Sequence, residues 1–231
     1  MDYPDWDLNW EDAIRSRNLL KVKNEIKKNI DVNMDMGNYR DTALHIACMF
    51  GDIDIIDLLI QHGANVNQKN KSMGTPLHNA AMFRNYDAVD LLIKHGALKN
   101  ELTKWGDSAI GHCLNNPTMV RFLIEHGCSV FTKGPHEFSL LSEAIDIGNI
   151  KTVRLLLHQG MDPRCIGPRG QDAYHRLRFV KDDIADLLLK AAWELDEAEN
   201  KLKMSVCKRE CECVDGTRRL QTKRLHENYE Q

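Results

Sequence analysis

The chain has 231 residues, of which 42% are hydrophobic and 28% are charged, and its formal net charge is −3. These values are typical of a folded globular protein and argue against a nucleic-acid binder that works through bulk positive charge. No apolar run reaches the roughly 20 residues that a membrane-spanning helix needs. The first twelve residues hold five acids and no base, unlike a secretory leader, so we expect a cytoplasmic protein with reduced cysteines. A basic stretch, TRRLQTKRLH, makes the nucleus an alternative location.

A repeat of about 33 residues organises the chain. The segment TALHIA begins at Thr42, and TPLHNA begins 33 residues later at Thr75. Weaker copies begin at Ser108, Ser139 and Asp172. A second pattern, represented by DLLIQHGANVN, runs in phase with the first. Its glycines are Gly63, Gly96, Gly127 and Gly160.

Each repeat predicts two short helices followed by an extended link. Threonine can cap a helix start, proline suits the first helical turn, and glycine suits a left-handed helix end. The apolar residues recur at helical spacing, and by this pattern we expect Leu91 to lie in the core. One such unit cannot bury its own apolar face, so neighbouring units must stack.

The two patterns resemble those of the ankyrin-repeat family. TALHIA and TPLHNA are similar to its T-P-L-H-x-A signature, and HGANVN is similar to its closing G-A-x-V-N. The resemblance covers roughly residues 8–192 and implies an all-α solenoid of stacked helix-turn-helix units joined by extended loops. We count six units, of which the first and the last are degenerate.

The expected organisation has four parts. Residues 1–12 form an acidic aromatic cap, residues 13–192 the repeat array, residues 193–204 a helical extension, and residues 205–231 a basic, cysteine-containing tail expected to be flexible. Trp6 and Trp10 are expected to cover the edge of the first unit, where Asn29 takes the glycine position. The fourth unit is short and carries Pro117 between its helices, which predicts a distorted turn.

No group of residues follows a known catalytic pattern, and no glycine-rich loop suggests phosphate binding. His45 and His78 occupy the fourth signature position, where the family resemblance implies a structural hydrogen bond. We therefore expect a non-enzymatic chain without a cofactor. A weak zinc candidate combines three tail cysteines with a histidine, although their spacing lacks a C-x-x-C pair. These residues are Cys207, Cys211, Cys213 and His226. The alternative is an exposed, reduced or modified tail.

The family resemblance also implies protein binding through a concave face, made of the link tips and the inner helices. Two Met-Phe pairs, 33 residues apart, would lie side by side in that groove, where such side chains often anchor partners. The alternative is that the phenylalanines belong to the core between repeats. The predicted binding residues are Met49, Phe50, Met82, Phe83, Met73, Trp105, Arg40, Lys71 and Lys104.

We therefore predict a protein-binding adaptor with a regulatory or inhibitory role, similar to inhibitors of Rel-type transcription factors. The alternatives are a substrate receptor of a ubiquitin ligase and a regulator that binds metal or nucleic acid through its tail. Asn67 resembles the asparagine that asparaginyl hydroxylases modify in ankyrin repeats, and it is also expected to tie its link by hydrogen bonds.

Overall fold

The structure is a computed structural model that describes residues 5–132, 140–162, 183–191, 194 and 197–198. The chain divides into two compact units, residues 1–185 and 186–231. The predicted anchors Ser139 and Asp172 and the whole tail from residue 205 lie outside the described residues. No helix among the described residues is long and apolar enough to cross a membrane.

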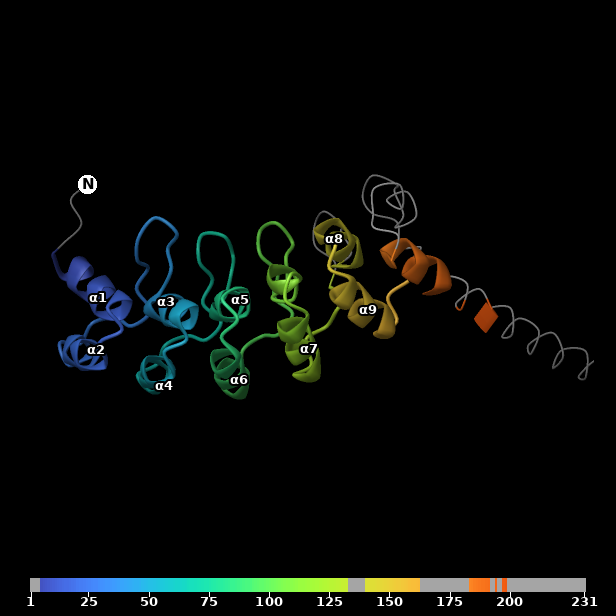
Figure 1. The fold of residues 1–231 in the computed structure, drawn as a ribbon. Coiled ribbons are helices and arrows are strands. Elements are labelled where there is room, and N and C mark those ends of the chain that lie inside the picture. Colours follow the sequence, from blue (N-terminus) through green and yellow to red (C-terminus); the bar gives the residue numbers. More distant parts are fainter. Residues whose placement is uncertain (1–4, 133–139, 163–182, 192–193, 195–196, 199–231) are drawn as a thin grey trace, which may run out of the picture. The chain divides into compact units, whose positions relative to one another are not determined.

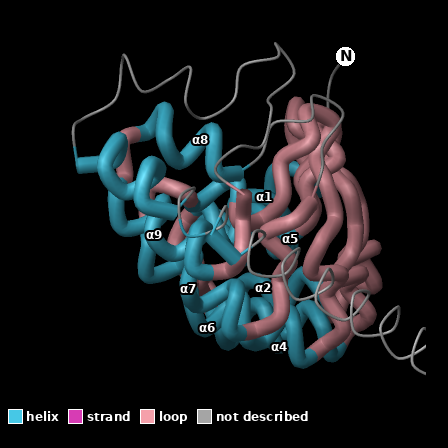
Figure 2. Tube along the Cα trace, turned by 90° about the vertical axis from the view of Figure 1, so that its right-hand side faces the viewer, coloured by secondary structure: helices cyan, strands magenta, loops and turns pink. Residues whose placement is uncertain are grey.

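Pairs of short helices follow one another through the described part of residues 1–185 (Figure 1). The helices are α1 (Asp5–Arg15), α2 (Leu19–Ile26), α3 (Ala43–Phe50), α4 (Ile53–Gln61), α5 (Pro76–Met82), α6 (Tyr86–Lys94), the 3-10 turn η1 (Gly111–Cys113), α7 (Pro117–Glu125), α8 (Leu140–Ile147) and α9 (Ile150–His158). Figure 2 shows the long loops gathered on one side of the helices. The predicted all-α repeat solenoid is confirmed.

The repeated residues set where the helices begin and end. The backbone N–H and the hydroxyl of Thr42 lie 3.2 and 2.9 Å from Nδ1 of His45, which closes the first turn of α3. The predicted glycines at the ends of α4, α6, α7 and α9 all have left-handed backbones, with φ between 83° and 86°. Asn29 adopts the same conformation in the first unit, with φ 59°, as expected from its alignment with these glycines.

The core lies between the helices of successive repeats. Inner helix α3 packs against α5, and outer helix α4 packs against α6. Ala47 and Ala80 are fully buried on the inner helices, where their small side chains allow close approach. On α6 the buried leucine is Leu92, whereas Leu91 is half-buried, so the predicted core position was wrong by one residue.

The fourth unit departs from the others, as its length predicts, but in a different place. Its first helix is reduced to the three-residue 3-10 turn η1. Pro117 does not lie in the turn between the helices but is the first residue of α7, where its missing N–H costs nothing. The side chain of Asn116 caps this helix by accepting from the N–H groups of Thr118 and Met119. The irregularity therefore affects the inner helix and leaves the outer helix intact.

The N-terminal residues and the start of the first repeat form one continuous helix. Helix α1 begins at Asp5 and runs across the expected boundary at residue 12. Trp10 is completely buried on this helix, so it contributes to the core of the first repeat. At the other end of the chain, residues 183–191 are helical, as are residues 194, 197 and 198.

Candidate functional site

The link loops stack on one another through their backbones. In the first loop, Met36 and Asp41 pair as an antiparallel bridge, with N···O distances of 2.7 and 3.2 Å. The N–H of Lys71 donates to the carbonyl of Tyr39 at 2.9 Å, and the N–H of Lys104 donates to the carbonyl of Ser72 at the same distance. Each loop is therefore held in register with the previous one.

The loop tips expose apolar and basic side chains. We call Met73, Trp105, Lys71 and Lys104 the tip patch. Met73 and Trp105 are both exposed, and the ammonium of Lys104 lies 4.4 Å from the centre of the Trp105 ring. Arg40, predicted as a further binding residue, instead pairs with Asp35 through an Nε–Oδ2 bond of 2.6 Å. A partner would have to compete with that ion pair for Arg40.

A second exposed group lies where the inner helices end. We call Met49, Phe50, Met82 and Phe83 the helix-end patch. Phe50, Met82 and Phe83 are 37–54% exposed, and Met49 is half-buried. The two phenylalanines are therefore not core residues of the repeat interface.

The turn beneath the helix-end patch is tightly held. The side-chain amide of Asn85 donates to the carbonyls of Cys48 and Met49 at 2.7 and 2.9 Å, which binds the end of α3 to the next repeat. Gly51 ends α3 with φ 70°, and a Cβ at this position would lie 2.7 Å from Oδ1 of Asn85. The patch therefore rests on a turn that accepts only glycine without rearrangement.

The predicted binding residues form two groups rather than one patch. The loops come before the inner helices, and the phenylalanines come at or just after the helix ends. Since α3 has eight residues, about 12 Å of helix separates the two groups.

The signature histidines are structural, as the family resemblance implied. Nδ1 of His45 accepts within its own repeat, and Nε2 lies 3.1 Å from the carbonyl of Gly74 in the next repeat. His78 makes the equivalent contact with the carbonyl of Asp107 at 3.3 Å. Burial lowers the pKa of both imidazoles and keeps them neutral, with Nε2 carrying the proton that these carbonyls accept.

The sequence pattern missed a histidine pair between the third and fourth repeats. The rings of His78 and His112 meet edge to face, with their centroids 5.5 Å apart. Burial and the neighbouring His112 lower the pKa of His78 to about 4, and burial also lowers the pKa of His112. Nε2 of His112 is buried without a hydrogen-bond partner among the described residues.

Asparagines at corresponding positions connect successive links. The side-chain amide of Asn67 donates to the carbonyl of Gly96 at 3.2 Å, and its oxygen accepts from the N–H of Leu98 at 2.8 Å. Asn33 makes the equivalent pair of bonds one repeat earlier, and the oxygen of Asn100 accepts from Ser129 one repeat later. The structural role expected of Asn67 is present, and its hydroxylation stays a prediction.

The zinc candidate in the tail lies outside the described residues. Within the part of the chain that the structure describes, no three His, Cys, Asp or Glu side chains come together as a metal site. Cys48, Cys113 and Cys128 are free thiols in the core. Burial raises the pKa of all three, to about 12 for Cys113 and about 11 for Cys128, so they are poor nucleophiles.

Comparison with known proteins agrees with this architecture. Residues 12–103 match the family model for ankyrin repeats (three copies). A 2-5A-dependent ribonuclease from the mouse, Mus musculus, is 31% identical over 64 residues, which make up 28% of this chain and 9% of that protein. The chain thus spans only a small part of this relative.

Residues 12–103 are ankyrin repeats, and paired helices continue beyond them to α9. Ankyrin repeats are in general non-enzymatic modules that bind other proteins, and the stacked repeats provide an extended surface for that purpose.

Proposed function

We propose that this chain is a non-catalytic adaptor that binds a protein partner across its inner helices and loop tips. The observation that carries the proposal is the helix-end patch. It exposes three large apolar side chains in two neighbouring repeats, on a turn that is otherwise closely packed. Water-exposed aromatic and methionine side chains grouped in this way are typical anchors for a protein partner.

The tip patch supports a contact that extends beyond these anchors. Lys71 and Lys104 have no ion-pair partner among the described residues, and the stacked backbone bonds fix the loops that carry them. Basic side chains at the rim of an interface steer an acidic partner and add specificity. We therefore propose a partner with an apolar segment for the helix ends and an acidic segment for the tips.

Affinity capture with three baits tests the proposal. The first bait is the unchanged protein, the second carries Phe50→Ala with Phe83→Ala, and the third carries Phe131→Ala. Phe131 is also exposed, but it lies in a link outside both patches, so it controls for loss of any exposed ring. We expect the unchanged protein and the Phe131 variant to retain the same partner and the double variant to lose it. Equal capture by all three baits would refute the proposal.

The identity of the captured protein would also distinguish an inhibitory adaptor from a substrate receptor. A transcription factor held in an inactive state would support an inhibitory adaptor, and subunits of a ubiquitin ligase would support the substrate-receptor alternative. Both roles use the same binding surface, so they are distinguished by the partner and not by the repeat architecture.

A further inference from the structure

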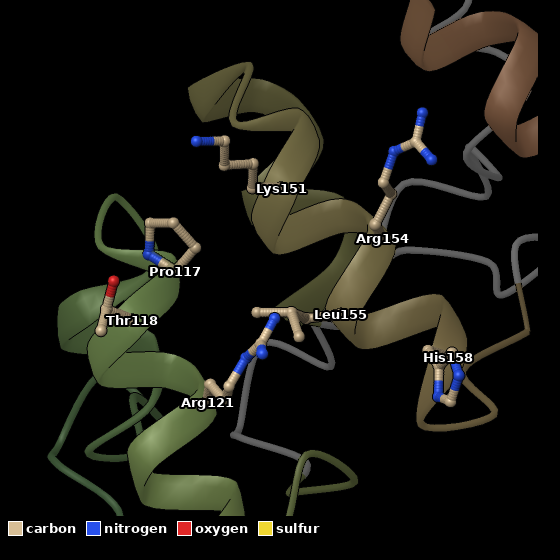
Figure 3. Close-up of a pocket in the computed structure, with 7 residues that line it drawn as sticks. All are labelled: Pro117, Thr118, Arg121, Lys151, Arg154, Leu155 and His158. Carbon is tan, nitrogen blue, oxygen red and sulfur yellow. The ribbon is translucent and has the colours of Figure 1, made fainter.

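A groove on the opposite side of the repeats, between outer helices α7 and α9, is lined by cations (Figure 3). Its volume is about 520 Å³, within the usual range for a small-ligand site. Arg121 comes from α7, and Lys151, Arg154 and His158 come from α9. Pro117 and Leu155 supply apolar walls.

No acidic side chain lines this groove. Arg121, Lys151 and Arg154 form no ion pair with any residue that the structure describes. Glu125 follows Arg121 by one helical turn, but the two form no ion pair within the described structure. The groove therefore concentrates positive charge that the fold leaves uncompensated, in a concave place where the field is strengthened.

The corresponding positions of the other outer helices carry the opposite charge. Helices α4, α6, α7 and α9 each have nine residues and the same place in their repeats. Their second and fifth residues are Asp54 and Asp57, then Asp87 and Asp90, then Thr118 and Arg121, then Lys151 and Arg154. Since the same scaffold accepts aspartate at these positions, packing of the repeat does not require the cations.

One of these cations is placed against the preference of its helix. Lys151 lies in the first turn of α9, where the helix dipole disfavours a positive charge, whereas Asp54 and Asp87 take the favourable sign in α4 and α6. A residue that lowers helix stability without forming a compensating contact is expected at a binding site.

Side chains, rather than backbone amides, would hold a ligand here. The N–H groups of Thr118 and Met119 at the start of α7 already donate to the side chain of Asn116. Figure 3 shows the guanidinium of Arg121 beside Leu155, Lys151 on the side of Pro117, and Arg154 directed away from Pro117. The positive groups are thus spread along the groove.

We propose that the α7/α9 groove binds a ligand that carries two or more phosphate groups. Arg121 from α7 and Lys151 from α9 contact the phosphate at one end of the groove, and Arg154, one turn further along α9, contacts the next phosphate. Each phosphate offers a compact double charge and several acceptor oxygens, which suits guanidinium and ammonium donors. The ligand is either a free oligophosphate or a segment of a protein with neighbouring phosphorylated side chains. This proposal is independent of the inner binding surface.

Titration of the full chain with two probes tests the proposal and distinguishes these sources. One probe is inorganic tripolyphosphate, and the other is a peptide with two adjacent phosphoserines, compared with the same peptide without phosphate. The groove variant combines Arg121→Glu with Lys151→Glu. The control variant combines Lys23→Glu with Lys27→Glu, which makes the same change in net charge at exposed residues near the end of α2. Circular dichroism checks that both variants fold.

We expect at least one phosphate probe to bind, more weakly as salt is raised, and to lose at least tenfold in affinity in the groove variant but not in the control. Binding of tripolyphosphate alone would assign a free ligand, and binding of the phosphopeptide alone would assign a protein segment. Absence of binding at millimolar probe, or equal losses in both variants, would overturn the proposal. So would self-association that the groove variant abolishes without any phosphate binding, because the acidic α4 and α6 helices of a second copy would then occupy the groove.

Discussion

Asn33, Asn67 and Asn100 make corresponding bonds in successive repeats, and they show how much one residue per repeat contributes to stacking. The amide of Asn67 uses both its donor and its acceptor on the next link. Such bonds join residues about 30 positions apart and thereby fix the spacing between repeats. The resemblance to ankyrin repeats predicted this role for Asn67, and the structure shows that the same bonding geometry recurs with the sequence period.

Replacing Asn67 with alanine should therefore destabilise the protein. We expect Asn67→Ala to lower the free energy of unfolding by about 1 kcal/mol, since the carbonyl of Gly96 and the N–H of Leu98 lose their partner. Urea denaturation measures the change. Asn24→Ala, at an exposed position of α2, is the control and should have little effect. A loss below about 0.3 kcal/mol for Asn67→Ala would show that water replaces these bonds.

Mass spectrometry of the protein purified from cells tests the predicted modification of Asn67. Hydroxylation adds one oxygen to the peptide that contains this residue. A peptide without the added oxygen would contradict the predicted hydroxylation of Asn67. The structural role of Asn67 would still be tested by the alanine variant.

The buried histidines predict that stability falls at acidic pH. The pKa of His78 is lowered to about 4, against about 6.5 in an unfolded chain. Between these values the unfolded state binds more protons than the folded state, so stability is complete above about pH 6.5 and declines as pH falls toward 4. We expect the free energy of unfolding to drop by at least about 1 kcal/mol between pH 7.5 and pH 5.5.

A variant of the neighbouring histidine separates this effect from the titration of other groups. His112→Phe keeps a ring beside His78 but removes one proton acceptor and the repulsion between two imidazoliums. We expect a smaller loss between pH 7.5 and pH 5.5 in this variant than in the unchanged protein. A pH-independent stability of the unchanged protein over that range would contradict the assignment of neutral, buried imidazoles.

At the scale of the helices, the sequence predicted most ends correctly and one buried face incorrectly. Threonine, proline and glycine have specific backbone preferences, so the starts and stops of the strong repeats could be predicted from single residues. The buried face of α6 could not be predicted in this way, because the segment DLLIK has adjacent apolar residues. Helical periodicity does not decide whether Leu91 or Leu92 is buried. The structure selects Leu92, which shares its face with Ala88 and Val89.

The choice between these leucines gives a direct stability test. Leu92→Ala should cost about 2–5 kcal/mol, because it leaves a cavity at a completely buried position. Leu91→Ala is the matched control, and its cost should be clearly smaller because Leu91 is half-buried. Thermal or chemical unfolding of the two variants compares them. Equal losses, or the larger loss at Leu91, would contradict the helix orientation described here.

The fourth repeat shows where local sequence signals stop being informative. Its length correctly indicated an irregularity, but the compression is in η1, and the turn predicted at Pro117 was wrong because this proline starts a regular helix. Proline is equally compatible with a turn and with a first helical position, and only packing against the neighbouring helices decides between them.

For the whole molecule, the repeat of about 33 residues was sufficient to predict the solenoid. The positions of the exposed patches could be determined only from the structure. The sequence placed Phe50 and Phe83 one repeat apart but left open whether they are core or surface, since both environments accept an aromatic side chain. It also treated the loop tips and helix ends as one patch, although an inner helix separates them. The cationic groove was missed because it depends on which residues of α7 and α9 face each other across two repeats.

Site-specific photo-crosslinking tests the central claim, that a protein partner lies on the inner helices. A photoreactive residue is introduced singly at Phe50, Met82 or Phe83, and for comparison at the outer-helix positions Asp54, Asp87 or Lys94. All six positions are solvent-accessible, so they differ mainly in the face they occupy. If the claim is correct, the captured partner crosslinks from the three inner positions and from none of the outer ones. Crosslinks confined to the outer helices would contradict it.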